Sequence, residues 1–209
     1  MEQNKLTPRG RPRQYDPDVA LARAMELFWE SGFAATSMDD LGAAMGMNRP
    51  SINAAFGDKS ELFIKVLHRY GAAGQATLQP ALSPELRLRE SLRDLFSMML
   101  NRFLSGEDAQ RGCLLFTVAA IEAVRSPPVR AVVAGATHAL DAAFEARFEI
   151  ARDKGEIART ANPADLALLA SGLAHTLSIR ARAGEKKSDL ERVIEVFLID
   201  ICGPEQNAG

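Results

Sequence analysis

Hydrophobic and polar positions follow one another along this chain with the period of an α-helix. Apolar residues recur every three or four positions through most of the sequence, and the period-two alternation of a half-buried strand is nearly absent. Ala, Leu, Met, Glu and Arg, which are good helix formers, dominate the composition. The pattern therefore predicts an all-α fold.

Capping residues divide this pattern into about nine helices. Asp16, Ser37, Asn48 and Asp58 each stand before an apolar run, where a side-chain oxygen can accept from a free helical N–H. The helices before about residue 80 are short, apart from the fourth, and those after it are longer. The helices are expected over residues 16–32, 37–46, 48–57, 58–77, 83–104, 110–124 and 127–154, with two more opening at Asn162-Pro163 and at Ser188, whose cap partner is Glu191.

The second and third expected helices raise a question, because helices this short are marginal alone. Only about three residues around Gly46 join them, which is the spacing of a helix-turn-helix, and glycine accepts the left-handed conformation of a tight corner. Their apolar positions can pack against the first helix, which leaves the start of the third helix free to enter a major groove. The residues expected in this small core are Leu41, Met45, Ile52, Phe56, Ala24, Leu27 and Phe28.

The residues at the start of the third helix suit contact with DNA. Arg49 can pair bidentately with guanine, which is worth about 1–3 kcal/mol of discrimination. Asn53 lies one turn later and can bond adenine or a phosphate, Ser51 can bond a base edge or a phosphate, and Pro50 and Ala54 are compact enough for close approach.

Two further residues stand at helix starts, where free N–H groups favour an anion. Ser37 and Lys59 are placed for phosphates in this way. Short capped helices also occur in many other helical proteins, and Arg49 and Lys59 equally fit solvated surface positions. The residues alone therefore leave both interpretations open.

Composition narrows the choice of function. The chain has 209 residues, 47% hydrophobic and 25% charged, as in an ordinary globular protein, and its net charge of -2 excludes a wholly basic nucleic-acid coat. The charge is uneven, since residues 1–15 carry Lys5, Arg9, Arg11 and Arg13 against one acidic residue. This segment predicts a flexible cationic arm that can enter a minor groove, with a disordered tail as the alternative.

Cysteines and motifs exclude other classes. Cys113 and Cys202 lie far apart, so they predict neither a disulfide framework nor a metal site, and they fit a cytoplasmic protein. We find no apolar core of a signal peptide and no apolar run long enough for a bilayer, so no membrane partner is expected. Nucleotide-binding, metal and nucleophile motifs are absent from the sequence, and we predict no catalytic residue, no cofactor and no metal.

Residues 20–63 closely resemble the DNA-binding domain of the tetracycline-repressor (TetR) family of bacterial transcription regulators. The matching positions are Phe28, Gly32-Phe33, Thr36-Ser37, Leu41, Ala44, Gly46, Asn48, Ser51, Phe56, Lys59 and Leu62-Phe63. The resemblance implies three helices for DNA and about six for ligand binding and dimerisation. It also implies a homodimeric repressor of double-stranded operator DNA that a small-molecule effector releases.

The resemblance also assigns residues and domains. It implies DNA contacts at Thr36, Ser37, Arg49, Pro50, Ser51, Asn53, Ala54 and Lys59. The family usually has a Tyr where Asn53 stands, so the phosphate role of that position is in doubt. The "GRPR" of residues 10–13 resembles a subgroup with a basic arm. The expected division is an arm over residues 1–15, a helix-turn-helix domain over 16–60 and a ligand-binding and dimerisation domain over 61–209.

Two apolar stripes in the last two helices are candidates for the dimer interface. They consist of Leu166, Leu169, Ala170, Leu173 and Leu177, and of Leu190, Val193, Ile194, Phe197 and Ile201. Such stripes can equally close the protomer's own core; the resemblance favours dimerisation.

The sequence gives weaker signals for the residues that bind the effector. An apolar pocket with a few polar groups can be built from Phe96, Met99, Phe103, Cys113, Phe116, Thr117, His138 and Phe144, although Phe and Met at this spacing also fit plain core. Cys113 opens the expected sixth helix beside Arg111, which predicts a lowered thiol pKa and a redox or electrophile sensor. The alternative is a small buried hydrophobe. For the whole chain, the competing functions are an enzyme on a helical bundle and a small-molecule carrier that has lost DNA binding.

Overall fold

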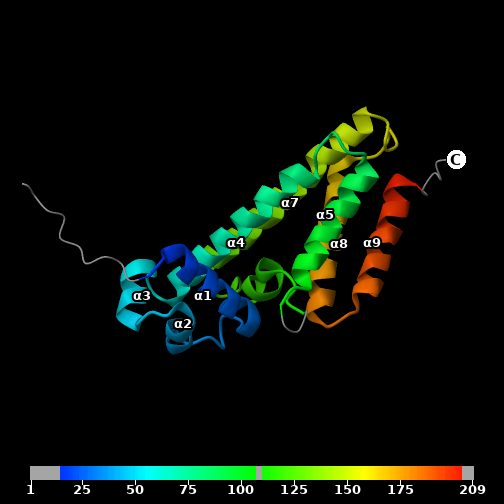
Figure 1. Ribbon diagram of the computed structural model, residues 1–209. Helices are drawn as coiled ribbons and strands as arrows, with labels where there is room; N and C mark the ends of the chain where they lie inside the picture. Colours follow the sequence, from blue (N-terminus) through cyan, green and yellow to red (C-terminus); the bar gives the residue numbers. More distant parts are fainter. Residues whose placement is uncertain (1–14, 107–109, 204–209) are drawn as a thin grey trace, which may run out of the picture.

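A computed structural model describes residues 15–106 and 110–203. Within these residues the secondary structure is entirely helical, so the all-α prediction is confirmed. Figure 1 shows a compact end built by the first three helices and joined to a bundle of longer helices. Because the sequence predicts that this end binds DNA, it is called the DNA-binding end. The elements are α1 (Pro17–Ser31), α2 (Met38–Met45), α3 (Arg49–Phe56), α4 (Lys59–Ala81), α5 (Leu88–Phe103), the π-helix η1 (Leu114–Ala119), α6 (Ala120–Glu122), α7 (Pro127–Asp153), α8 (Pro163–Arg182) and α9 (Lys187–Cys202).

The first three helices begin and end where their capping residues predict, and the fourth begins where its cap predicts. The Asp16 carboxylate accepts from the backbone N–H groups of α1, and Ser37 and Asp58 each form a reciprocal capping box at the start of α2 and α4. Gly46 ends α2 with φ 66° and ψ 34°, the left-handed conformation that the corner before α3 requires. These local signals therefore fix the corner between the two short helices.

The core of the DNA-binding end is closed by aromatic side chains. The rings of Phe28 and Phe33 lie 4.9 and 4.8 Å from the ring of Phe63, which comes from α4. Leu41 and Ile52 are fully buried against this cluster, and Met45 and Phe56 are buried beside them. The packing predicted for α1, α2 and α3 is thus confirmed, and it leaves one face of α3 exposed to solvent.

The helix α4 passes without a break from the DNA-binding end into the bundle (Figure 1). It ends at Ala81 rather than near Thr77, and it carries Pro80 in its last turn. A turn follows, and α5 begins only at Leu88 instead of Ser83. The buried Ser91 hydroxyl donates to the Ala81 carbonyl over 2.6 Å and ties the two helix ends together. These shifts lengthen α4 as a connector.

The helix expected over residues 110–124 is the clearest error of the sequence prediction. Residues 110–113 are not helical; a π-helix follows them, and a single turn named α6 comes next. Tertiary contacts explain this departure. The N–H groups of Arg111 and Gly112 both donate to the Phe103 carbonyl, and the N–H of Cys113 donates to the Ser178 hydroxyl over 2.7 Å. These bonds to α5 and α8 hold residues 111–113 in a non-helical conformation.

The bundle packs α7 against α8 and α5 against α9. In its core the Phe96 ring stacks on Phe144 at 5.8 Å and meets Phe197 edge-on at 5.6 Å. The start of α9 differs from the prediction, because Lys186 rather than Ser188 stands at the cap and no side chain caps this helix. In the described part of the chain, no helix combines the length and apolarity needed to cross a bilayer.

Candidate DNA interface and ligand cavity

The first turn of α3 presents an unengaged arginine to solvent. Arg49 is the first residue of α3 and is exposed, and within residues 15–106 and 110–203 its guanidinium has no hydrogen bond or ion pair. The helix start itself is held by Asn48, whose side-chain oxygen accepts from the N–H of Ser51 over 2.9 Å. Because Asn48 does the capping, the Arg49 side chain stays available for a partner.

The rest of α3 has one buried and one open face. Ile52 and Phe56 are buried in the core of the DNA-binding end, whereas Asn53, Ala54 and Pro50 are exposed. Ser51 is half-buried. The structure therefore brings Arg49, Pro50, Asn53 and Ala54 onto one solvent-facing surface, as an element that enters a groove requires.

The residues before α2 look less suited to DNA. The Thr36 side chain is buried, with 2% exposed, and its hydroxyl donates to the Gly32 carbonyl over 2.7 Å. The assignment of this side chain to DNA is therefore wrong, since it serves the corner after α1. The Ser37 hydroxyl donates to the Asp40 carboxylate over 2.6 Å, and this bond lowers the pKa of Asp40. Ser37 stays a prediction, with an ionised carboxylate beside it.

Lys59 lies at the first position of α4 and is half-buried. Its ammonium stands 4.4 Å from the centre of the Phe33 ring, a cation–π contact that holds the side chain against the DNA-binding end. This placement is compatible with the predicted phosphate contact. The predicted arm residues Arg9, Arg11 and Arg13 lie outside the described residues.

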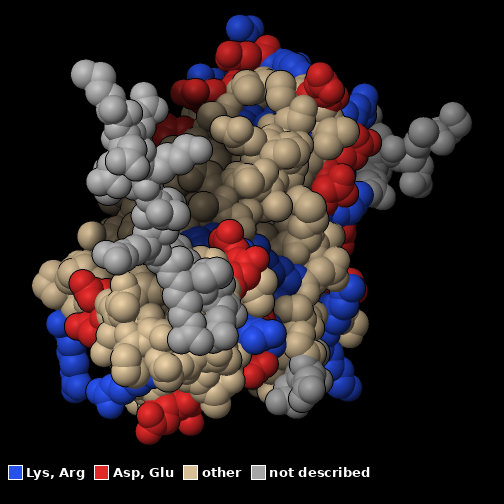
Figure 2. All heavy atoms as spheres, turned by 60° about the vertical axis from the view of Figure 1, so that its left-hand side comes forward, with Lys and Arg blue, Asp and Glu red and all other residues tan. Residues whose placement is uncertain are grey.

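Figure 2 brings the DNA-binding end forward. Lys and Arg are interspersed there with Asp and Glu, and the visible described surface carries no continuous basic field. To attract DNA, a protein with this surface and a net charge of -2 depends on a few cations at specific positions. The free arginine at the start of α3 therefore carries more weight than the overall charge.

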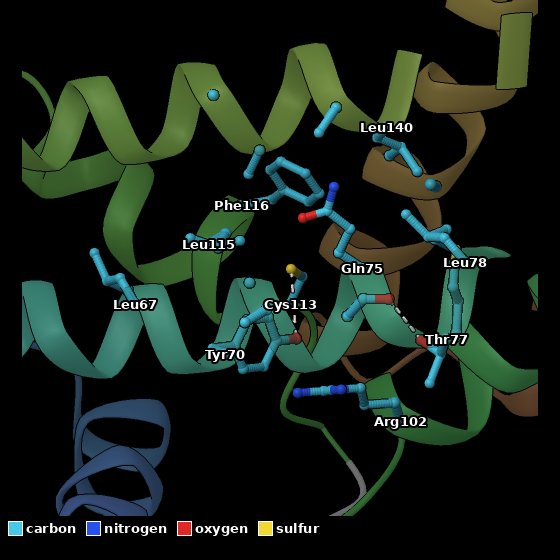
Figure 3. Close-up of a pocket in the computed structure, with 18 of the residues that line it drawn as sticks. Leu67, Tyr70, Gln75, Thr77, Leu78, Arg102, Cys113, Leu115, Phe116 and Leu140 are labelled. Atoms are coloured by element: carbon cyan, nitrogen blue, oxygen red, sulfur yellow. Dashed lines mark hydrogen bonds between the residues drawn. The ribbon is translucent and has the colours of Figure 1, made fainter. Parts of the chain in front are cut away.

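A cavity of about 510 Å³ lies within the bundle, between α4, α5, η1 and α7 (Figure 3). Its size is typical of sites for small organic molecules, and most of its lining is apolar. Four of the predicted ligand residues line it, namely Met99, Phe103, Cys113 and Phe116. The sequence thus predicted four residues that border this cavity, and their contact with a ligand stays a prediction.

The other four predicted ligand residues do not line the cavity. Phe96 and Phe144 are fully buried and pack on each other in the core. The Thr117 hydroxyl donates to the Cys113 carbonyl over 2.7 Å, and His138 is exposed on α7. Assigning these four residues to the cavity was therefore wrong.

Sequence reasoning missed the polar groups of the cavity. These are Tyr70, Gln75 and Thr77 from α4, Arg102 from α5, and His68 at the edge. Tyr70 and Arg102 face each other, with the guanidinium 4.1 Å from the ring centre (Figure 3). The only signal available in the sequence was the run of small residues from Gly71 to Gly74, which leaves room beside α4.

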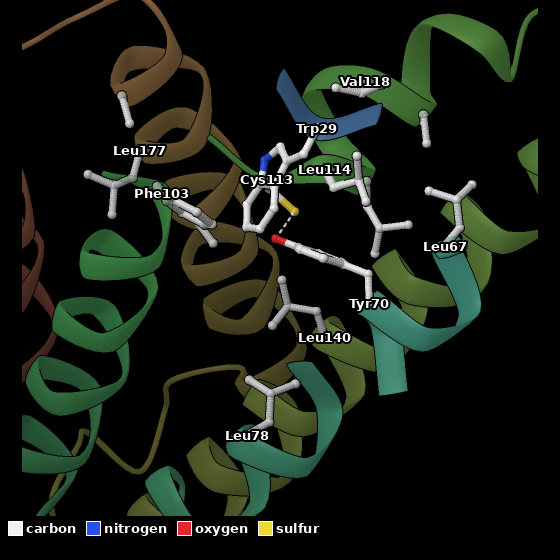
Figure 4. Packing of buried hydrophobic residues seen from close by; sticks show 14 of the residues in the cluster. Trp29, Leu67, Tyr70, Leu78, Phe103, Cys113, Leu114, Val118, Leu140 and Leu177 are labelled. Atoms are coloured by element: carbon white, nitrogen blue, oxygen red, sulfur yellow. Dashed lines mark hydrogen bonds between the residues drawn. The ribbon is translucent and has the colours of Figure 1, made fainter. Parts of the chain in front are cut away.

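Cys113 is buried among apolar side chains, as Figure 4 shows. The Tyr70 hydroxyl lies 3.5 Å from its sulfur, and burial raises the pKa of both groups. The expected lowering of the thiol pKa is therefore wrong. Arg111 does not act on the thiol, because its guanidinium forms ion pairs with Glu26 and, over 2.6 Å, with Glu30.

These ion pairs belong to a set of contacts between the cavity and the DNA-binding end. Trp29 of α1 donates from its indole nitrogen to the Gly112 carbonyl over 3.2 Å, and its ring meets the Tyr70 ring edge-on at 5.1 Å. Arg182 of α8 donates to the carbonyls of Trp29 and Arg111. A change in the cavity thus has two physical routes to α1 and α3, one through α4 and one through Trp29 and Arg111.

Comparison with known proteins assigns the chain to a family. Residues 20–66 match the model of bacterial regulatory proteins of the tetR family, and residues 87–197 match the model of the tetracyclin repressor-like C-terminal domain. The chain belongs to the TetR family. This membership agrees with the resemblance found in residues 20–63, and it extends it to the bundle.

The relatives of this chain include a transcriptional repressor and a regulator solved with operator DNA. The HTH-type transcriptional repressor ComR of Escherichia coli is 33% identical over 190 residues, which cover 90% of this chain and 88% of ComR. The solved structure of the regulator CifR, a cysteine mutant complexed with 26-base-pair operator DNA, superposes with a TM-score of 0.81 and 30% identity over 90% of this chain and 98% of that one. Reduced NemR of E. coli has a TM-score of 0.78 at 21% identity over 90% of this chain and 98% of that one, which indicates the same fold.

In this TetR-family chain, half of the eight residues predicted for the dimer interface face inward. Leu173, Leu177, Leu190 and Ile194 are buried within the protomer's own core, so assigning them to a surface was wrong. Leu166, Phe197 and Ile201 are half-buried, and Leu169 is 57% exposed. The outward faces of α8 and α9 carry other large apolar residues as well, namely Leu168, Ile179, Val196 and Ile199.

Proposed function

We propose that this TetR-family protein is a sequence-specific transcriptional repressor that reads its operator with the first turn of α3. The observation that carries the proposal is the free, exposed Arg49 on a helix whose opposite face is locked into a closed core. A repressor relative and a relative solved with operator DNA support it. Arg49 pairs with guanine, Asn53 and Ala54 contact the neighbouring bases, and Lys59 contacts phosphate.

The proposal divides the chain as the sequence predicts. Residues 16–60 read DNA, residues 61–209 bind the effector and the second protomer, and the basic arm of residues 1–15 adds contacts in a minor groove. The break between the first two parts falls inside a continuous helix, since α4 begins at Lys59. A rigid helix shared by both parts suits the transmission of movement from the cavity to α3.

The exposed apolar faces of α8 and α9 support a homodimer. Leu168, Leu169 and Ile179 lie 57–61% exposed on α8, and Val196 and Ile199 add a matching face on α9. Covering apolar side chains this exposed with a second copy of the chain is favourable, because it removes apolar surface from water. A two-fold axis through this face would present two α3 helices to two half-sites of a palindromic operator.

The oligomeric state is tested by sedimentation of the wild type and of Leu169→Glu. The wild type is expected as a dimer and the variant as a monomer at the same concentration. Val19→Glu, which changes an exposed apolar residue of α1, serves as the matched control and keeps the dimer. A Leu169→Glu variant that stays dimeric would contradict this interface.

Release from the operator follows from occupancy of the cavity. An effector that favours a state with wrongly spaced α3 helices needs a coupling of only about 1–3 kcal/mol to lower occupancy 5–150-fold. The two routes to α1 and α3 carry this coupling, because the cavity is lined by α4 and lies against the Trp29 and Arg111 contacts.

The deciding experiment titrates labelled promoter DNA from around the protein's own gene against a scrambled duplex over a range of salt concentrations. A repressor binds the promoter fragment selectively, and its affinity falls steeply with salt. Equal, weak binding to every duplex would instead favour a small-molecule carrier or an enzyme built on this bundle.

A second candidate function is electrophile sensing through Cys113, which is favoured by the position of its thiol on the cavity wall. The raised thiol pKa predicts slow reaction with electrophiles in bulk solvent. An electrophile held in the cavity would react nevertheless. If Cys113→Ser is released from DNA by N-ethylmaleimide as readily as the wild type, the sensor role is rejected.

A further inference from the structure

The charges on the cavity wall point to the chemical class of the effector. Among the described residues that line the cavity, none is Asp or Glu, although the chain contains 27 acidic residues. Arg102 is the one permanently charged residue in the lining, accompanied by His68 at the edge. The wall therefore favours a negative ligand and disfavours a positive one.

Arg102 is also unengaged. Within residues 15–106 and 110–203 its guanidinium has neither an ion pair nor a hydrogen bond, and its contacts are with aromatic faces. It lies 4.1 Å from the centre of the Tyr70 ring and 5.7 Å from the centre of the Trp29 ring. Stacking of this kind holds the plane of a guanidinium and leaves the N–H groups at its edge free for an oxyanion.

The remainder of the lining requires an apolar ligand body. Leu67, Leu78, Leu95, Leu115 and Leu140 face the cavity together with the predicted Met99, Phe103 and Phe116. Figure 3 shows Gln75 pointing into the space beside Phe116, so a polar group along the ligand also finds a partner. One cation at one side of an otherwise apolar hollow suits a molecule with a single anionic head.

We propose that the effector is an amphipathic organic carboxylate whose head pairs with Arg102 and whose apolar body fills the cavity. This inference rests on the proposed function, because it names the ligand class of the same cavity. It also gives the ligand a direct effect on the DNA-binding end. A carboxylate on Arg102 neutralises the cation that faces Trp29 of α1, and it weakens that cation–π contact.

The test compares matched probes that differ only in the head group. Octanoate, octanamide and octylamine are titrated into the full-length protein, alongside 4-phenylbutanoate and its amide. Binding is measured by calorimetry and by the emission of Trp29, the single tryptophan of the chain. Each carboxylate is expected to bind about tenfold or more tightly than its amide, which is the gain of one charge-assisted hydrogen bond, and octylamine is expected to bind weakest.

Variants assign the preference to one side chain. Arg102→Gln is expected to bring the affinity for octanoate down to that for octanamide, and Arg102→Lys to retain part of the difference. Arg159→Gln removes an exposed arginine that does not line the cavity, and it leaves the preference intact. Operator binding without ligand shows that each variant is folded.

The outcomes separate this inference from the proposed function. Amides that bind as tightly as carboxylates, an absence of binding by both carboxylates, or a preference that survives in Arg102→Gln overturns the inference. In each case a wild type that still selects its promoter DNA keeps the repressor proposal intact. A wild type that prefers carboxylates through Arg102 without selecting any duplex retains the ligand class and overturns the repressor.

Discussion

The two ends of this molecule carry their functions in opposite ways. The DNA-binding end has a closed apolar core around Phe28 and Phe63, and we propose that it contacts DNA through polar groups on its surface. The bundle encloses a cavity with a mostly apolar wall, and we propose that this wall binds the effector. An outward-facing site can therefore be recognised in the sequence by its polar residues and helix caps. An inward-facing site has the same sequence pattern as the hydrophobic core.

The largest expected effect on stability comes from replacing a phenylalanine with alanine, and its size is expected to differ between the two ends. Phe28→Ala removes a fully buried ring from a closed core and is expected to cost about 3–5 kcal/mol of unfolding free energy. Phe116→Ala removes a half-buried ring that borders an existing cavity, so a cost of about half as much is expected. Urea denaturation of both variants measures the difference. Equal costs would show that the cavity wall is packed as tightly as the core.

Gly112 lies between the two ends and tests the contact of Trp29. Its φ is +63°, and an added Cβ would stand 2.6 Å from the Ser178 carbonyl oxygen. Gly112→Ala is therefore expected to cost about 2 kcal/mol and to alter Trp29 emission, because Gly112 accepts from the indole N–H. Thermal unfolding and fluorescence check this expectation. An unchanged melting temperature with unchanged emission would mean that the two ends are not joined there.

Gly135 provides the opposite case on the cavity wall. An added Cβ would find nothing within 4 Å, and the residue lies inside α7, where Ala is the better helix former. Gly135→Ala is expected to stabilise the protein by about 0.5–1 kcal/mol and to weaken binding of octanoate by filling part of the cavity. Denaturation and calorimetry measure the two effects. A destabilised variant would contradict the open space beside this helix.

The smallest expected effect concerns pH. Burial lowers the pKa of His175, which lies beside Phe116 at 4.0 Å and faces Asp141, whose charge opposes the shift. Because the unfolded chain then binds more protons below about pH 6.5, stability falls as the pH drops through that range. His175→Gln is expected to lose less stability than the wild type between about pH 7.5 and about pH 5.5. Identical losses in both proteins would exclude this contribution.

Local signals explain how far the sequence could be interpreted. Asp16, Ser37, Asn48 and Asp58 act on N–H groups within three residues of themselves, so the bounds of the first helices followed from the sequence. Residues 110–113 escaped prediction because their N–H groups bond to Phe103 and Ser178, which are distant in the chain or on another helix.

Some residues predicted for the cavity and the interface were misplaced for a related reason. The apolar stripes of α8 and α9 each have an inner and an outer face, and only packing shows that Leu173 and Ile194 lie inside whereas Leu168 and Val196 lie outside. Phe96 and Phe116 have the same composition signal, although one is core and the other lines the cavity. Arg102 stood in a helix with other charged residues, and nothing local marked it as facing a hollow.

The central claim is that the first turn of α3 reads the operator. The most direct measurement is the competition of operator and scrambled duplexes for the wild type, for Arg49→Ala and for Arg159→Ala as a surface-charge control. The account predicts that Arg49→Ala loses about 5–150-fold of the discrimination, equivalent to about 1–3 kcal/mol, while the control keeps all of it. Undiminished discrimination in Arg49→Ala would contradict the account.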